Sequence, residues 1–296
     1  MALPLSRRTL VAAGLALPAI HVGRARAASS DRPLKLVLNV GLQTLDPIAG
    51  PSFVTRNFAY MVYDTLISMD SKGQFRPQML EGWKITDGGM VYTFTLRPGL
   101  KFSDGQPVTS EDCIASLKRW GARDALGRRL MAATKELRQV DERNFVLELS
   151  RPFGLVLDAL GKPSVQVPFI MPARIANSAP PTTPVKEIVG SGPYLFNREE
   201  WVPGERATFR RNPDYVPRNE PADGLAGGKV VKVERAELLT MPELATRAAA
   251  LQTNEVDYLE YAPFDFLSGF MTNKDIVVAK AGGPALMMAA LSINHL

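Results

Sequence analysis

The sequence predicts an α/β fold, and three observations carry that prediction. A β-rich run, LKLVLNV, occupies residues 34–40. Over residues 229–263 the pattern passes from strand to helix to strand, as in a βαβ unit. The apolar fraction of 46% is normal for a soluble globular protein, and no solenoid repeat is visible in the 296 residues. A chain of this length holds one large domain or two ordinary ones.

The individual elements follow from apolar spacing and turn residues. A long loop at residues 41–57 leads into a predicted helix at 57–67, where apolar side chains recur near helical spacing. Residues 162–193 are proline-rich and predict an irregular crossing between two lobes. The other predicted elements are a strand at 88–99, a strand at 144–150, a hairpin at 193–215 around Pro203-Gly204, a strand at 229–240, a helix at 240–256 and a strand at 256–263.

A dense run of turn and capping residues occupies positions 101–112. Gly105 suits a turn that needs positive φ, and Thr109 with Asp112 predicts a capping box at a helix start. Thr240 with Glu243 predicts a second capping box. The helix that begins after Thr109 carries apolar residues three positions apart, at Ile114, Leu117 and Trp120. Turn and cap chemistry accounts for these polar residues, so the run is interpreted as architecture and not as a catalytic loop.

Residues 1–27 predict an export signal. Arg7 and Arg8 precede a modest apolar stretch that is too short to span a bilayer, and small residues end the segment at Ala27. The paired arginines favour the twin-arginine route, with cleavage after Ala27. A Sec signal and an unprocessed basic arm are the alternatives. No cysteine lies near the cleavage point, so a lipid anchor is not expected.

The charge of the chain depends on this segment. The formal net charge is +5, and residues 1–27 contain four arginines and no acidic side chain. Cleavage would therefore leave the chain almost neutral. No basic patch then remains that would indicate nucleic-acid binding.

The side chains needed for common catalytic sites are scarce. The two histidines are His21, inside the predicted signal, and His295, the penultimate residue. Cys113 is the single cysteine, lies in the predicted amphipathic helix and is interpreted as a packed residue. Ser191 lacks both a nucleophile motif and a base. Zinc, P-loop and dithiol motifs are absent from the sequence, so neither a metal nor a cofactor is expected. A catalytic site built from two carboxylates is the alternative that is left, although no short spacing of Asp and Glu points to a particular pair.

Several stretches together resemble the extracellular solute-binding proteins of family 5, the peptide-, oligopeptide- and nickel-type receptors of ABC importers. The resemblance covers residues 34–296. The stretches that carry it are LDP at 45–47, the long run from VYDTLI to LKRW at 62–120, GSGPY at 190–194 and ALQTNEVDYLE at 250–260.

The resemblance implies a bilobed α/β receptor like the type II periplasmic binding proteins, which closes around its ligand. Lobe I would be discontinuous, at 28–80 and 188–268, with a smaller domain inserted at 81–187. Residues 269–296 would begin a second lobe, most of which is missing from this chain. Family members are longer, so the expectation is a fragment, a truncated gene or a split receptor.

Ligands of open α/β sheets gather at loops beyond the carboxyl ends of strands, and two such loops are candidates. The candidate ligand-binding residues are Leu45, Asp46, Ala49, Gly50, Pro51, Ser52 and Phe53 in the first loop, and Glu260, Tyr261 and Ala262 in the second. In the family both regions face the cleft. The alternative is structural, with Asp46 capping a turn and with Phe53 and Tyr261 packed in the core.

The expected function is a periplasmic substrate-binding protein without catalysis, monomeric, that delivers peptides or similar small solutes to ABC permease subunits. Nickel complexes, heme, sugars and opines stay open as ligands. One alternative is a nonbinding truncated remnant with an exposed apolar patch. The other is a secreted hydrolase that uses carboxylates.

Overall fold

The computed structural model describes residues 32–279, and the segments 1–31 and 280–296 lie outside the description. The predicted export signal and the last part of the predicted second lobe fall in those two segments. Among residues 32–279, no helix is long and apolar enough to cross a membrane.

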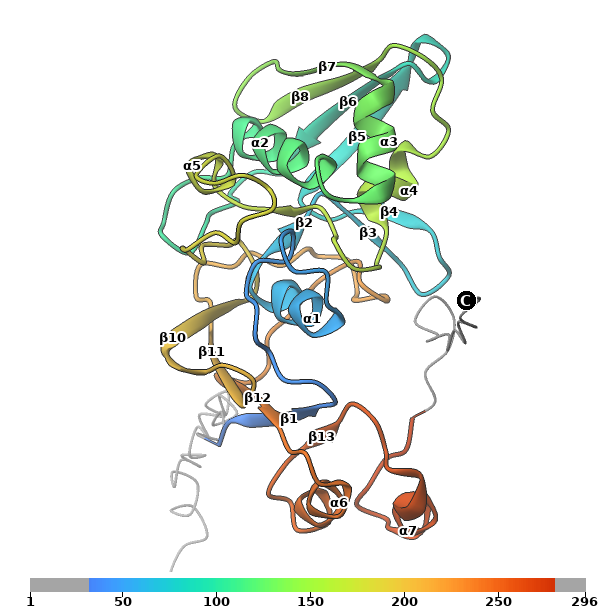
Figure 1. Cartoon of the computed structure of the whole chain (residues 1–296). Coiled ribbons are helices and arrows are strands. Elements are labelled where there is room, and N and C mark those ends of the chain that lie inside the picture. The colour runs from blue at the N-terminus through green and yellow to red at the C-terminus, as the bar shows by residue number, and fades with distance from the viewer. Residues whose placement is uncertain (1–31, 280–296) are drawn as a thin grey trace, which may run out of the picture.

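The larger sheet is mixed and has five strands in the order β10-β11-β12-β1-β13. Strand β1 is parallel to both β12 and β13, whereas β10, β11 and β12 run antiparallel. Its strands are β1 (Leu34–Leu38), β10 (Tyr194–Val202), β11 (Arg206–Arg211), β12 (Arg235–Thr240) and β13 (Tyr258–Leu259). The first strand of the chain therefore lies between two of the last (Figure 1).

The predicted βαβ unit is present, with β1 between its two strands. Helix α6 (Leu244–Gln252) connects β12 to β13 and covers one face through Ala250, which packs with Val37 and Val256. The second capping box is wrong, because Thr240 ends β12 and Glu243, the N-cap, makes no side-chain cap hydrogen bond. Pairing of Thr240 with Leu38 of β1 keeps this residue in the strand, and α6 begins four positions later, at Leu244.

The smaller sheet is antiparallel, in the order β5-β6-β8-β7. Its strands are β5 (Leu80–Thr86), β6 (Val91–Leu96), β7 (Thr134–Gln139) and β8 (Asn144–Leu149). Strand β6 buries every second residue, which confirms the predicted alternation. Helices α2 (Ser110–Gly121) and α3 (Ala125–Ala133) lie beside this sheet in the upper part of the molecule (Figure 1).

The helix predicted at 57–67 is misplaced. Helix α1 spans Phe53–Val62, and β2 (Asp64–Thr65) follows it at once. Strand β2 pairs with β9 (Phe169–Ile170), and this tertiary pairing holds the backbone extended where apolar spacing alone favours a helix. The remaining elements, which are not among the predicted ones, are β3 (Ile67–Met69), β4 (Phe75–Pro77), α4 (Val156–Gly161), α5 (Ala173–Ala176), α7 (Leu267–Thr272) and the 3-10 turns η1 (Asp87–Gly89) and η2 (Phe264–Phe266).

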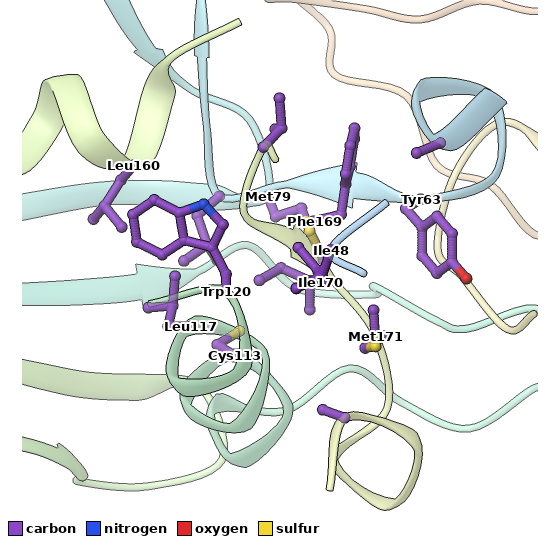
Figure 2. Close-up of a cluster of buried hydrophobic side chains, with 14 of the residues drawn as sticks. Ile48, Tyr63, Met79, Cys113, Leu117, Trp120, Leu160, Phe169, Ile170 and Met171 are labelled. Atoms are coloured by element: carbon purple, nitrogen blue, oxygen red, sulfur yellow. The ribbon is translucent and has the colours of Figure 1, made fainter. Parts of the chain in front are cut away.

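One continuous apolar core joins the two sheets. It contains Phe209 of the larger sheet, Phe94 of the smaller one and Phe169 between them. Figure 2 shows its central part, where Trp120 and Cys113 of α2 point into the cluster. Burial raises the pKa of the Cys113 thiol well above its usual value, as expected for a packed cysteine.

The first capping box is confirmed and supports a stability prediction. Asp112 Oδ2 accepts from Thr109 N at 2.8 Å, and Asp112 Oδ1 accepts from Ala173 N at 2.7 Å. Asp112→Ala removes a cap and an interhelical hydrogen bond, so we expect it to lower the free energy of unfolding by about 2 kcal/mol. Urea denaturation measures the change. Glu111→Ala, at an exposed neighbouring position, is the matched control, and equal losses in the two variants would contradict the assignment.

Candidate functional site

The two candidate loops leave the same edge of the larger sheet. Strands β1 and β13 are parallel, so their carboxyl ends lie side by side. Glu260 N donates to Val37 O at 2.9 Å, and Asn39 N donates to Glu260 Oε2 at 2.8 Å. Segments 221 positions apart in the sequence therefore meet at this edge.

Helix α1 joins the same edge through Asn57. Its Nδ2 donates to Glu260 Oε1 at 3.3 Å, so the Glu260 carboxylate is held by a backbone amide on one oxygen and a side-chain amide on the other. Hydrogen bonds to both oxygens hold a carboxylate in one orientation. Glu260 is half-buried, and it is the point where β1, β13 and α1 connect.

Arg56 extends this set, and neither it nor Asn57 is among the predicted residues. Arg56 Nη2 and Nε donate to Asn57 Oδ1 at 2.8 and 3.2 Å, and Nη1 donates to Pro163 O at 3.0 Å. Its guanidinium lies 4.9 Å from the centroid of the Phe53 ring. Burial lowers the pKa of Arg56, while the neighbouring Tyr60 and Glu260 act in the opposite direction. Because α1 starts at Phe53, Arg56 and Asn57 lie about one helical turn after Phe53, the last candidate residue of the first loop.

Aromatic side chains flank this polar group. Phe53 is 53% exposed and Tyr261 is 40% exposed, so neither is packed in the core as the structural alternative held. The nearby Ala49, Gly50, Ser52 and Ala262 are half-buried and Pro51 is exposed. Apolar surface beside fixed polar groups is the usual composition of a small-molecule site.

Asp46 and Leu45 do not belong to this exposed set. Both are buried. Asp46 Oδ1 accepts from Ile48 N at 2.8 Å, and Oδ2 accepts from Arg119 Nη2 at 2.8 Å and from Val185 N at 2.9 Å. Both oxygens are thus committed to the protein interior, and the turn-capping alternative describes Asp46 correctly.

A hollow of about 350 Å³ opens beside Glu260 and Asn57. Apart from these two residues, it is lined by Leu34, Leu36, Leu38, Met61, Tyr194, Ala236, Leu238 and Tyr258. Its walls are therefore apolar and its polar groups lie at the sheet edge. A second hollow of about 460 Å³ lies next to Ala262 and is lined by Phe264, Leu267, Met271, Ile276, Val278 and Ala279.

Within 32–279, no group of three or more His, Cys, Asp or Glu side chains could hold a metal ion. Ser191 is buried, and its Oγ contacts Met79 Sδ at 4.0 Å. The glycines beside it allow a close backbone approach, because a Cβ on Gly190 would lie 2.1 Å from Val62 O.

The chain is similar in sequence to known proteins over most of its length. The sequence profile of the bacterial extracellular solute-binding proteins, family 5 (middle), matches residues 74–296. A probable peptide ABC transporter periplasmic-binding protein, y4tO of Sinorhizobium fredii, is 40% identical over 270 residues, which cover 89% of this chain and 50% of that protein. A probable D,D-dipeptide-binding periplasmic protein of Escherichia coli, DdpA, is 26% identical, with 86% of this chain and 47% of that protein covered.

Solved structures show the same fold. The binding protein AgaA of A. tumefacien, in complex with agropinic acid, superposes with a TM-score of 0.66 at 25% identity, covering 82% of this chain and 46% of that one. A dipeptide binding protein of Pseudoalteromonas in complex with Met-Leu superposes with a TM-score of 0.67 at 20% identity, covering 82% and 50%. The chain spans about half the length of the curated relatives it matches.

Proposed function

The chain belongs to the bacterial extracellular solute-binding proteins of family 5, and from that premise we propose that it captures peptides or similar small solutes in the periplasm for an ABC importer. Delivery to the permease subunits, export by the twin-arginine route, a monomeric state and the absence of catalysis are parts of this proposal. The relatives described above carry names of peptide and dipeptide receptors, which supports the ligand class.

One observation carries the proposal for this chain. Two loops and the start of α1 converge at the carboxyl edge of parallel strands, where Glu260 is held by Asn39 and Asn57. Ligands of open α/β sheets bind at this edge, because backbone groups and loop side chains converge there without strands to cover them. The ligand-facing residues that we propose are Ala49, Gly50, Pro51, Ser52, Phe53, Glu260, Tyr261 and Ala262.

The domain boundaries predicted above remain part of the proposal. A discontinuous lobe I at 28–80 and 188–268 is supported by the position of β1 between β12 and β13. An inserted domain at 81–187 is supported by the antiparallel sheet β5-β6-β8-β7. Limited proteolysis tests these boundaries, since cleavage should concentrate in the exposed stretches that precede them, at 71–74 and 182–187.

Native mass spectrometry of the chain purified from the periplasm tests export and binding together. We expect the mass of residues 28–296 plus a small species that dissociates on collisional activation. Conversion of Arg7 and Arg8 to lysine should leave the uncleaved mass in the cytoplasm if the twin-arginine route is used. A bare mature mass, unchanged by added peptide mixtures and other solutes, would contradict the proposal and favour the nonbinding remnant. Turnover of an added peptide or glycoside would favour the hydrolase.

A further inference from the structure

Two half-buried charged side chains at the proposed site lack an oppositely charged partner. Neither Arg56 nor Glu260 forms an ion pair within 4.0 Å among residues 32–279. Elsewhere in the described chain, Asp46 pairs with Arg119 and Asp64 with Lys229, whereas the buried Arg247 is held by hydrogen bonds alone. Removing a charge from water without a partner is unfavourable, so an arrangement that keeps two such charges close together calls for an explanation.

The side-chain amide of Asn57 lies between the two charged groups and forms a hydrogen bond with each of them. Its Oδ1 accepts from the Arg56 guanidinium and its Nδ2 donates to the Glu260 carboxylate. The amide therefore separates a cation from an anion and orients both. The Phe53 ring, 4.9 Å from the guanidinium, further restricts Arg56.

Both charged groups retain hydrogen-bonding capacity. A guanidinium has five N–H donors. Arg56 uses three of them, one each on Nε, Nη1 and Nη2. A carboxylate accepts about four hydrogen bonds, and Glu260 receives two. Donors with positive charge and acceptors with negative charge are thus available at the same sheet edge, beside an apolar hollow.

We propose that Arg56, Asn57 and Glu260 form a specificity-determining polar subsite for a zwitterionic group of the solute. Glu260 accepts from an ammonium of the ligand, and Arg56 donates to a carboxylate of the same ligand. The exposed aromatic rings of Phe53 and Tyr261 contact its apolar part. This inference rests on the proposed function and narrows its ligand class to small solutes with both charges close together, such as short peptides with free termini.

Binding of one dipeptide and its blocked forms tests the subsite without altering the protein. The probes are leucyl-leucine, N-acetyl-leucyl-leucine and leucyl-leucine amide, titrated calorimetrically into the whole chain. Each blocked form removes one charge of the zwitterion. We expect each to bind at least tenfold more weakly than leucyl-leucine, because it leaves Glu260 or Arg56 desolvated without a charged partner.

Two charge-removing variants assign each preference to its side chain. Glu260→Gln keeps an acceptor for Asn39 N, and should lose the preference for the free amine while keeping the preference for the free carboxylate. Arg56→Gln should lose the preference for the free carboxylate while keeping the preference for the free amine. Glu199→Gln and Arg151→Gln, at exposed positions, are the matched controls and should bind as the unaltered chain does.

The outcomes separate this inference from the proposed function. Binding of leucyl-leucine with the same preferences in Glu260→Gln and Arg56→Gln as in the controls overturns the inference alone. Binding of other solutes, but of none of the three probes, also overturns the inference alone. A chain that binds no solute in the native mass spectrum overturns the proposed function, and the inference with it.

Discussion

Replacing Asp46 by alanine is expected to lower the free energy of unfolding by about 3–5 kcal/mol, because the partner charge is then left buried and uncompensated. The side chains of Asp46 and Arg119 are 0% and 2% exposed, and their closest atoms lie 2.8 Å apart. Arg119 also donates to Ala179 O and Thr183 O, so the pair ties the loop at 45–49 to α2 and to the irregular segment around 179–185.

Chemical denaturation compares this variant with two others. Lys135→Ala breaks the exposed pair of Lys135 with Glu148 and should cost less than about 1 kcal/mol. The double variant Asp46→Leu with Arg119→Met removes both charges together and should be more stable than Asp46→Ala. A double variant that is less stable than Asp46→Ala would contradict this explanation. It would show that the loop at 45–49, α2 and the segment around 179–185 are held together by the ion pair itself.

Trp120→Ala is expected to lower the free energy of unfolding by about 3–5 kcal/mol, since it leaves a large cavity in the shared core. The indole is fully buried among side chains that include Leu117 and Leu160 (Figure 2). Its Nε1 donates to Gln166 O at 2.6 Å, and a Cβ on Gly127 would lie 3.2 Å from the ring. Packing on all sides leaves little scope for the cavity to collapse.

Two further variants separate packing from hydrogen bonding at this position. Trp120→Phe keeps most of the ring contacts but removes the hydrogen bond, and should fall between the native chain and Trp120→Ala. Leu155→Ala, at a largely exposed position, should cost less than about 1 kcal/mol. A loss for Trp120→Ala as small as that for Leu155→Ala would mean that the described core around α2 is not formed in solution.

Local patterns predicted several elements correctly. The alternation in β6 needs only its own residues, because successive side chains of a strand point to opposite faces. The hairpin of β10 and β11 around Gly204, which has positive φ, follows from a local turn. The cap of α2 by Asp112 is a contact over three positions. In each case the interaction that decides the structure lies within a few residues.

Predictions failed where distant pairing outweighed local preference. The residues after Val62 have helical spacing, yet β2 pairs with β9, whose residues lie more than a hundred positions away. Thr240 resembles a helix cap, yet it extends β12 along β1. Asp46 was predicted to face a ligand, yet it is paired with Arg119 in the interior. Local spacing contains no information on these partners.

The sequence by itself determined the family, the α/β class, the capped helix α2 and the two loops where a ligand site was predicted. Only the tertiary structure decided which residues of those loops are available, and that Arg56 and Asn57 belong with Glu260. Asn57 and Glu260 are 203 positions apart and meet only because β1 inserts beside β13 and α1 follows from its loop. Their contact depends on strand order, and strand order is set by the burial of whole sheet faces and not by any single motif.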